Sequence, residues 1–273
     1  MEVTPQDAQF VRELVFRRAA IKLDDEKDYF IEMRLAQLAS TCGASSIAEL
    51  VDGARRGLSG AEIRIIEALT THETYFFRDL HPFEIMKKQV IPELMAARQS
   101  ARQLTIWCAA CSSGQEPYSL ALMLRENFTA LATWKIRIVA TDLSEQILAK
   151  ARDGIFTQIE MNRGLPAAYL PKYFERSGLH WQIRTDIRAM VEFRQLNLID
   201  NWFLTPTPDL VMLRNVLIYF DLPTKRRILD RVRQQIASDG RLFLGAAETT
   251  LNVAEGWERM ANDKQTYYRV KVQ

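Results

Sequence analysis

Cysteine is scarce in this 273-residue chain, and long apolar runs are missing. Three cysteines are far too few for a disulfide scaffold, and they fit a reducing cytoplasm. No uncharged apolar stretch approaches the ~20 residues that span a bilayer, and Arg214 breaks the densest run, residues 210–220. The N-terminus has neither the basic nor the apolar region of a secretion signal. We therefore expect a cytoplasmic protein with no membrane insertion.

An excess of charge of one sign is also missing. The chain has 36 Lys and Arg against 34 Asp and Glu, a net charge of +2. A dedicated nucleic-acid binder is strongly basic, so we expect no nucleic-acid partner. The distribution is uneven, because residues 1–80 carry a net charge of −4 and residues 81–273 a net charge of +6. Attraction to an acidic partner would have to come from local patches.

Two periodicities divide the chain. In residues 1–80 apolar side chains recur every three or four positions, which predicts a domain of helices. From about residue 103 to the end of the sequence, short apolar strands alternate with helical stretches, which is typical of an α/β domain with a mostly parallel sheet. In such sheets ligands bind outside the carboxyl ends of the strands. We expect strands near residues 104–108, 136–141, 191–196, 209–215, 241–245 and 266–272.

The loop after the first expected strand and the acid after the second suggest a nucleoside site. Residues 109–114 are small, and Gly114 lets the backbone approach a ligand closely. The loop matches neither a dinucleotide fingerprint nor a phosphate loop, so a plain turn into a helix stays open. Asp142 could accept both hydroxyls of a ribose, or cap the following helix beside Ser144. Together the loop and the acid favour a nucleoside ligand.

Cys108 and Cys111 follow Trp107 in a W-C-x-x-C pattern that also occurs in redox-active pairs. The spacer is Ala-Ala, and neither a second C-x-x-C nor a nearby pair of histidines completes a set of zinc ligands. We therefore expect two buried small side chains and no metal site.

Polar residues interrupt the apolar run at the end of the fourth expected strand. Burying Arg214 and Asn215 there is costly unless both are partnered, which favours a site over simple packing. Tyr219, a little further on, would by itself more often be a core ring with a satisfied hydroxyl.

Residues 70–79 change from polar to aromatic and end on a cation. They form either a capped joint between helices or a segment that folds over a ligand, with Arg78 holding a carboxylate. His72 could act as a general base, although a single histidine is more often structural.

In this order, five motifs resemble those of the CheR family, bacterial chemoreceptor glutamate O-methyltransferases that use S-adenosylmethionine. The motifs are Thr70-Thr71-x-Glu73-Thr74-x-Phe76-Phe77-Arg78-Asp79, Cys111-Ser112-x-Gly114-x-Glu116-Pro117-Tyr118-Ser119, Ala140-Thr141-Asp142-Leu143-Ser144, Leu196-Asn197-Leu198 and Arg214-Asn215-Val216-Leu217-Ile218-Tyr219-Phe220-Asp221. The resemblance covers nearly the whole chain. It implies an all-helical N-terminal domain of residues 1–80, a linker helix of residues 81–102 and a Rossmann-like methyltransferase sheet in residues 103–273. A small antiparallel β-subdomain would be inserted at about residues 160–192.

The resemblance also implies a binding site for S-adenosylmethionine. Asp142 would hold the ribose, and Arg214 and Asn215 would lie beside the reacting end of the cofactor. The implied cofactor-binding residues are His72, Thr74, Arg78, Glu116, Asp142, Asn197, Leu198, Arg214 and Asn215. The family usually has Asn at the position of His72.

The implied reaction needs no general base, which is consistent with the absence of the usual catalytic arrangements from the sequence. A glutamate side chain, with a pKa of ~4.3, is ionised at neutral pH and needs no general base. This explains why no Ser-His-Asp, Cys-His or paired-carboxylate arrangement is found. The enzyme must align a carboxylate oxygen with the donated methyl and exclude water. Arg214 and the Tyr219 hydroxyl are the expected catalytic residues, because they could orient that carboxylate.

The implied partner is the helical bundle of a chemoreceptor cytoplasmic domain, bound through a basic helix of the N-terminal domain. Here the basic residues of that domain are scattered among carboxylates; they are Arg17, Arg18, Lys22, Lys27, Arg34, Arg55 and Arg56. Some relatives grip a C-terminal receptor peptide with the β-subdomain. Residues 174–180 lack the longer Gly-rich loop of those relatives, so we expect a peptide-independent enzyme. We also expect a monomer.

Two other functions stay open. One is a catalytically silent receptor-binding module of the same fold, against which the matched site positions argue. The other is a methyltransferase acting on nucleic acid or a small molecule, for which neither a strongly basic face nor an N/D-P-P-Y/F motif is found.

Overall fold

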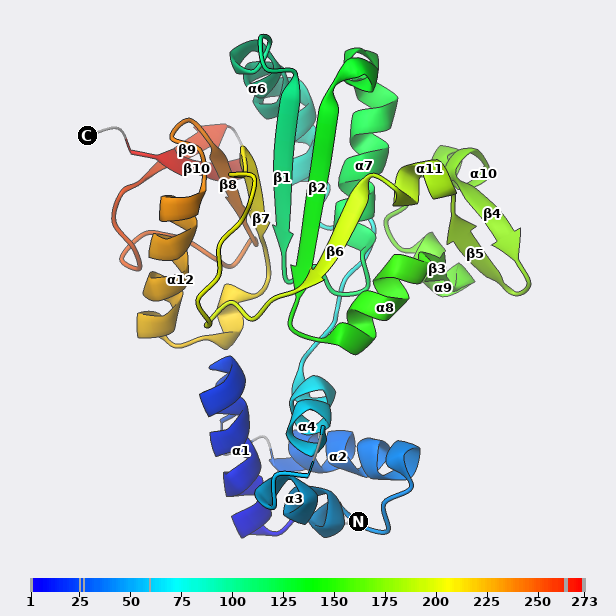
Figure 1. Cartoon of the computed structure of the whole chain (residues 1–273), viewed down its shortest axis with the longest axis vertical. Coiled ribbons are helices and arrows are strands. Elements are labelled where there is room, and N and C mark those ends of the chain that lie inside the picture. The colour runs from blue at the N-terminus through cyan, green and yellow to red at the C-terminus, as the bar shows by residue number, and fades with distance from the viewer. Residues whose placement is uncertain (1, 25, 27, 59, 263–264, 272–273) are drawn as a thin grey trace. The chain divides into compact units, whose positions relative to one another are not determined.

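The computed structural model describes residues 2–24, 26, 28–58, 60–262 and 265–271 (Figure 1). By their contacts the residues form two units, one of residues up to 71 together with 219–224, the other of the remainder. The division falls between Thr71 and His72, earlier than the expected boundary at residue 80. The segment that follows Thr71 therefore groups with the sheet and not with the helices.

The first unit consists mainly of four helices. They are α1 (Pro5–Ala19), α2 (Asp28–Cys42), α3 (Ile47–Arg55) and α4 (Ala61–Leu69). The hydroxyl of Thr4 caps α1 and that of Ser46 caps α3, each by accepting a backbone N–H of the first turn. The apolar positions Val11, Ile31 and Val51 are fully buried. The spacing of three and four thus gives the helical core that it predicted.

The second unit is built on a seven-stranded sheet of order β6-β2-β1-β7-β8-β10-β9. The first five strands in this order run parallel, and β10 and β9 are antiparallel to their neighbours. The strands are β1 (Gln103–Ala109), β2 (Lys135–Asp142), β6 (Val191–Gln195), β7 (Leu210–Leu213), β8 (Arg241–Leu244), β9 (Trp257–Asn262) and β10 (Gln265–Val270). The expected mostly parallel α/β sheet is confirmed, with β9 as a strand that the sequence analysis did not predict.

Helices and single turns connect these strands. They are α5 (His81–Ile85), the π-helix η2 (Met86–Val90), α6 (Ile91–Ala97), α7 (Gln115–Asn127), η3 (Thr129–Thr133), α8 (Glu145–Asp153), α9 (Gln158–Asn162), η4 (Ala167–Tyr169), α10 (Leu170–Tyr173), α11 (Thr185–Arg188), η5 (Leu217–Tyr219) and α12 (Leu222–Gln235). In α7 the ten residues from Gln115 to Leu124 are all buried. Among the described residues, no helix has both the length and the apolarity to cross a membrane.

A separate three-stranded antiparallel sheet, of order β3-β5-β4, lies beside α8 and α11 (Figure 1). Its strands are β3 (Ile155–Phe156), β4 (Phe174–Ser177) and β5 (His180–Ile183). The sheet begins before residue 160, the expected start of the insertion, because the chain turns directly from α8 into β3. Gly154 makes this turn with φ 61°, and a Cβ there would come within 2.6 Å of Ile183 Cγ2.

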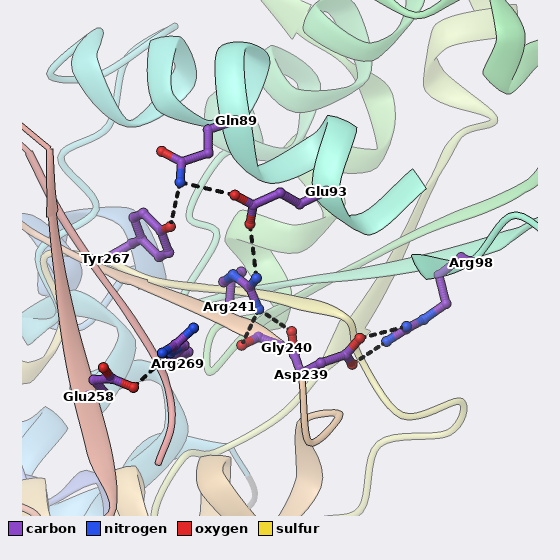
Figure 2. A network of polar contacts seen from close by, with 9 residues as sticks. All are labelled: Gln89, Glu93, Arg98, Asp239, Gly240, Arg241, Glu258, Tyr267 and Arg269. Carbon is purple, nitrogen blue, oxygen red and sulfur yellow. Dashed lines mark hydrogen bonds and ion pairs between the residues drawn. The ribbon is translucent and has the colours of Figure 1, made fainter. Parts of the chain in front are cut away.

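A polar network ties α6 to the amino ends of the parallel strands (Figure 2). Arg98 Nε donates to Asp209 Oδ1 at 2.7 Å, and its Nη atoms donate to the two Asp239 carboxylate oxygens at 2.8 and 2.5 Å. Arg241, the first residue of β8, donates to Glu93 Oε2 at 2.9 Å. These five residues are called the amino-edge network below. They fix the helix at the amino edge of the sheet.

Candidate active site

Four parallel strands end at one edge of the large sheet. β1 ends at Ala109, β2 at Asp142, β7 at Leu213 and β8 at Leu244. Because parallel strands share a carboxyl edge, the loops that follow them meet there. The polar residues singled out from the sequence follow these strand ends.

Asp142 is held by the loop after β1. Its Oδ2 accepts the backbone N–H of Ser112 at 2.8 Å, and its Oδ1 accepts that of Ser144 at 3.1 Å. Burial raises the pKa of this carboxyl, while the two backbone hydrogen bonds act in the opposite direction. The cap of α8 is supplied by the hydroxyl of Ser144, which accepts from Ile147 N at 3.2 Å. Asp142 thus joins two loops, and a further backbone hydrogen bond from Leu143 also lowers its pKa.

The loop between β1 and α7 depends on left-handed backbone conformations. Ser112 has φ 50° and Gly114 has φ 92°. The φ of Gly114 favours glycine, and a Cβ there would make a tight contact of 3.1 Å with Ala151 Cβ. This geometry directs the Ser112 N–H towards Asp142 and packs the loop closely against α8.

Arg214, directly after β7, lies at the centre of a buried ion cluster. Its Nη1 donates to Glu116 Oε2 at 2.6 Å, and its Nη2 donates to Asp79 Oδ2 at 2.6 Å and to the Arg78 carbonyl at 3.0 Å. The Arg214 side chain is 1% exposed, and its Nε is buried with no hydrogen-bond partner among the described residues. Burial raises the pKa of Glu116, and Arg214 opposes that shift. Asp79, Glu116 and Arg214 form the carboxyl-edge cluster.

Glu248 is a site residue that the sequence analysis missed. Its Oε2 accepts from the backbone N–H of Asn215 at 2.8 Å and of Gly245 at 2.6 Å, and its Oε1 accepts from Ile218 N at 3.3 Å. A Cβ at Gly245 would come within 2.7 Å of Asn215 Nδ2. Glu248 therefore holds the turn after β7 against the loop after β8. The only signal in the sequence is an acid shortly after a strand, which is common.

Residues 72–79 lie against the loop after β1 and the start of α7. Ser112 Oγ donates to the His72 carbonyl at 2.9 Å, and Phe77 N donates to Ser119 Oγ at 2.9 Å. Arg78 Nη1 donates to the Glu73 carbonyl at 2.8 Å. These contacts hold residues 72–79 against the loop after β1 and against α7, and the hypothesis that the segment folds over a ligand stays a prediction.

The remaining predicted residues are more scattered. Asn197 Oδ1 accepts from Ile199 N at 3.3 Å, and the carbonyl of the buried Leu198 accepts from Trp202 Nε1 at 3.1 Å. Thr74 is half-buried within residues 72–79. Tyr219 groups with the helical unit, where its carbonyl accepts from Lys22 N at 3.1 Å. The catalytic role of its hydroxyl stays a prediction.

Cys108 and Cys111 are buried and free. Burial raises the pKa of both thiols well above the ordinary value, so neither carries the thiolate that redox chemistry uses. In the part of the chain that the structure describes, no group of three or more His, Cys, Asp and Glu side chains could hold a metal ion.

Comparison with known proteins gives two family matches and close relatives. Residues 6–70 match the CheR methyltransferase all-alpha domain, and residues 72–266 match the CheR methyltransferase SAM binding domain. Chemotaxis protein methyltransferase 1 of Pseudomonas aeruginosa is 39% identical over 275 residues, covering 99% of this chain and 100% of the relative. Chemotaxis protein methyltransferase Cher2 of Pseudomonas putida is 36% identical over 270 residues, covering 97% and 98%.

Among solved structures, a TehB-like SAM-dependent methyltransferase from Corynebacterium glutamicum aligns with 83% of this chain and 100% of its own, at a TM-score of 0.41 and 14% identity. The two domain matches and the relatives carry the assignment. The chain belongs to the CheR methyltransferase family, with an all-alpha domain followed by a SAM-binding domain.

Proposed function

We propose that this protein transfers a methyl group from S-adenosylmethionine to glutamate side chains of chemoreceptor cytoplasmic domains, and so acts in the cytoplasm. Family membership supports the methyl donor, and the names of the relatives support a role in chemotaxis. The observation that carries the proposal is the carboxyl-edge cluster. One guanidinium faces two carboxylates there, which leaves one net negative charge when both carboxylates are ionised.

The carboxyl edge fits S-adenosylmethionine. Asp142 keeps acceptor capacity for ribose hydroxyls, and the net negative cluster is complementary to a sulfonium cation. When bound, this molecule supplies an electrophilic methyl group on sulfur. The residues that would complete its binding site are His72, Thr74, Arg78, Asn197, Leu198 and Asn215.

The contacts of Arg214 refine its proposed role. Both terminal nitrogens are already engaged by protein acceptors, so Arg214 is better suited to position Glu116 and Asp79 than to grip a substrate carboxylate. Tyr219 then remains the candidate that orients the acceptor. The accepting glutamate is ionised at neutral pH, so the protein's task is alignment and the exclusion of water.

The basic residues of the helical unit form the proposed surface for receptor docking, and carboxylates neutralise some of them. Arg18 pairs with Glu62 at 2.6 Å and Arg55 pairs with Asp7 at 2.8 Å, while Lys27 lies outside the described residues. We propose that the basic residues of this unit, the partly neutralised Arg18 among them, steer receptor binding. Reversing Arg17, Arg18 and Arg34 to Glu should then lower receptor methylation, and unchanged methylation would contradict this role.

We also propose that the protein acts as a monomer without a receptor tail peptide. β4 and β5 pair up to Ser177 and His180, so only Gly178 and Leu179 form the turn between them. Such a short turn offers little loop surface to grip a peptide. Titration with receptor tail peptides should show no binding, and micromolar affinity would contradict the proposal. Light scattering in solution tests the oligomeric state.

One experiment tests the reaction itself. The protein is incubated with S-adenosylmethionine labelled in the methyl group and with receptor cytoplasmic fragments. We expect label in base-labile methyl esters on the fragments. Calorimetric binding of S-adenosylmethionine without label transfer would instead identify a catalytically silent receptor-binding module.

A further inference from the structure

A pocket of about 430 Å³ opens beside the carboxyl ends of β7 and β8. Arg214 and Asp79 of the carboxyl-edge cluster line it, together with the loop of residues 244–249. The β9–β10 hairpin supplies another part of its lining. Asp142, Asn197 and Leu198, the proposed nucleoside contacts, do not line this pocket. It therefore adjoins the proposed methyl-transfer site without being the nucleoside site.

The fixed carboxylates of this pocket are already engaged. Asp79 accepts from Arg214 at 2.6 Å, and Glu248 accepts from three backbone N–H groups. The pocket can therefore hold an additional anion only if it also contains a cation that is not neutralised.

Arg259 of β9 is that cation. It is exposed, and its guanidinium donates from Nε and Nη2 to the hydroxyl of Thr266 at 3.3 and 3.0 Å. Within the described residues it forms no ion pair with a carboxylate. Arg269 of the same hairpin, by contrast, donates to Glu258 at 2.7 Å (Figure 2). One hairpin thus carries a neutralised arginine and, lining the pocket, a second arginine that lacks a carboxylate.

Hydroxyl groups surround this arginine. Tyr268 is 3% exposed and its hydroxyl donates to Thr249 Oγ1 at 3.4 Å, and both residues line the pocket with Thr266. A guanidinium with hydroxyl donors beside it suits a carboxylate, which accepts through two oxygens. The chemistry of the pocket therefore fits an acidic protein segment.

We infer that this pocket receives the receptor segment that contains the methylated glutamate, and that Arg259 pairs with a second carboxylate of that segment. The inference rests on the proposed function and names a specificity-determining residue for it. Arg214 is buried and Arg259 is exposed, so Arg259 lies nearer the mouth of the pocket. The accepting side chain must reach the buried end, which leaves a neighbouring Asp or Glu for Arg259.

The test is a kinetic comparison of substitutions on the hairpin. Arg259→Ala should raise the KM for a receptor cytoplasmic fragment about two- to fivefold, the range of an exposed ion pair. Arg259→Glu should raise it about tenfold or more through like-charge repulsion. In both variants kcat and the Kd for S-adenosylmethionine should stay unchanged. Arg259→Lys keeps the positive charge, so its KM for the fragment should stay close to that of the wild type. Arg269→Ala is the matched control, with the same charge loss on the same hairpin and no expected change in KM.

The partner carboxylate is located by neutralising acidic residues of the fragment one at a time. One such change should raise the KM of the wild-type enzyme and leave that of Arg259→Ala unchanged. An unchanged KM in Arg259→Ala and Arg259→Glu, or an equal rise in Arg269→Ala, would overturn the inference and leave the proposed function intact. A wild-type enzyme that methylates no receptor fragment would overturn both. A normal Kd for S-adenosylmethionine in each variant shows that it is folded.

Discussion

The two edges of the large sheet each carry an arginine–carboxylate network, and the networks differ in burial. At the carboxyl edge the Arg214 side chain is 1% exposed and meets two carboxylates. At the amino edge Arg98 is 21% exposed and its partner Asp239 is 48% exposed. The arginine is thus fully removed from water at one edge and keeps partial access to it at the other.

This difference indicates what each network does. Taking ions out of water costs several kcal/mol per ion, so a buried ion cluster is weak support for a fold. Such an arrangement is typical of functional sites, where pKa values are also perturbed. The amino-edge network needs no such cost to fix a helix. We therefore interpret the carboxyl-edge cluster as functional and the amino-edge network as structural, and the predictions below separate these roles.

The largest effect is expected from Arg214→Met. This substitution leaves Glu116 and Asp79 without their cation, and removing one partner of a buried pair costs about 3–5 kcal/mol. We expect that loss in the free energy of unfolding, measured by urea denaturation, together with loss of methyl transfer.

Glu116→Gln supplies the control for this prediction. Adding it to Arg214→Met removes one of the two stranded charges, so the double variant should be more stable than the sum of the single effects indicates. If the two single changes in the free energy of unfolding simply added, the 2.6 Å contact between Arg214 and Glu116 would contribute no interaction energy.

The next effect concerns Asp142→Asn, which keeps the shape of the side chain and removes its charge. A hydrogen bond to a charged group contributes about 1.5–3 kcal/mol, so the Kd for S-adenosylmethionine should rise roughly ten- to a hundredfold in calorimetry. Asp209→Asn is the counterpart at the amino edge, because Asp209 also accepts a backbone N–H, that of Thr105 at 2.8 Å. It should lower stability without changing this Kd. Equal changes in Kd would remove the functional distinction between the edges.

The sequence predicted the fold well where one periodicity dominated. The helical spacing of residues 1–80 and the apolar strands β1, β2 and β7 carry strong local signals. β9 was missed because Glu258 and Arg259 interrupt the apolar pattern of this short segment, and antiparallel pairing with β10 decides its conformation.

The site was predictable only in part. Asp142 and Arg214 stand out because each is a polar residue at the end of an apolar strand. The partners of Arg214 come from 98 and 135 positions away, and no local pattern links such residues. Glu248 escaped notice because its role depends on three backbone N–H groups that only the folded loops bring together. Topology supplies these contacts, and the periodicity of the sequence does not contain them.

A smaller effect is expected from Arg98→Met at the amino edge. Its contacts with Asp209 and Asp239 are partly hydrated, so the free energy of unfolding should fall by about 1–2 kcal/mol. The kcat and the KM for both substrates should match the wild type when measured well below the melting temperature. A change in kcat as large as that of Arg214→Met would show that the two networks are coupled through the sheet.

The smallest expected effect is on the free energy of unfolding in acid, to which the two edges should contribute changes of opposite sign. The Arg98 hydrogen bond holds the pKa of Asp239 below its ordinary 3.8, so this group contributes stability that is present above 3.8 and is lost as pH falls through the lowered pKa. Burial raises the pKa of Glu116 above its ordinary 4.5, so its contribution is present below 4.5 and is lost as pH rises through the raised pKa. As pH falls from neutral, protonation of Glu116 first removes the destabilisation that its buried charge causes. Protonation of Asp239 removes a stabilising contribution only at lower pH.

Urea denaturation between about pH 3 and 7 separates the two contributions, because this range spans the ordinary pKa values of Asp and Glu. Asp239→Asn should flatten the loss of stability at the acid end by less than about 1 kcal/mol, because an exposed ion pair contributes no more. Glu116→Gln should instead remove the gain in stability that protonation of Glu116 is expected to give as pH falls towards 4.5. If both variants changed the curve in the same direction, burial would not distinguish the edges. The contrast between them would then be one of geometry alone.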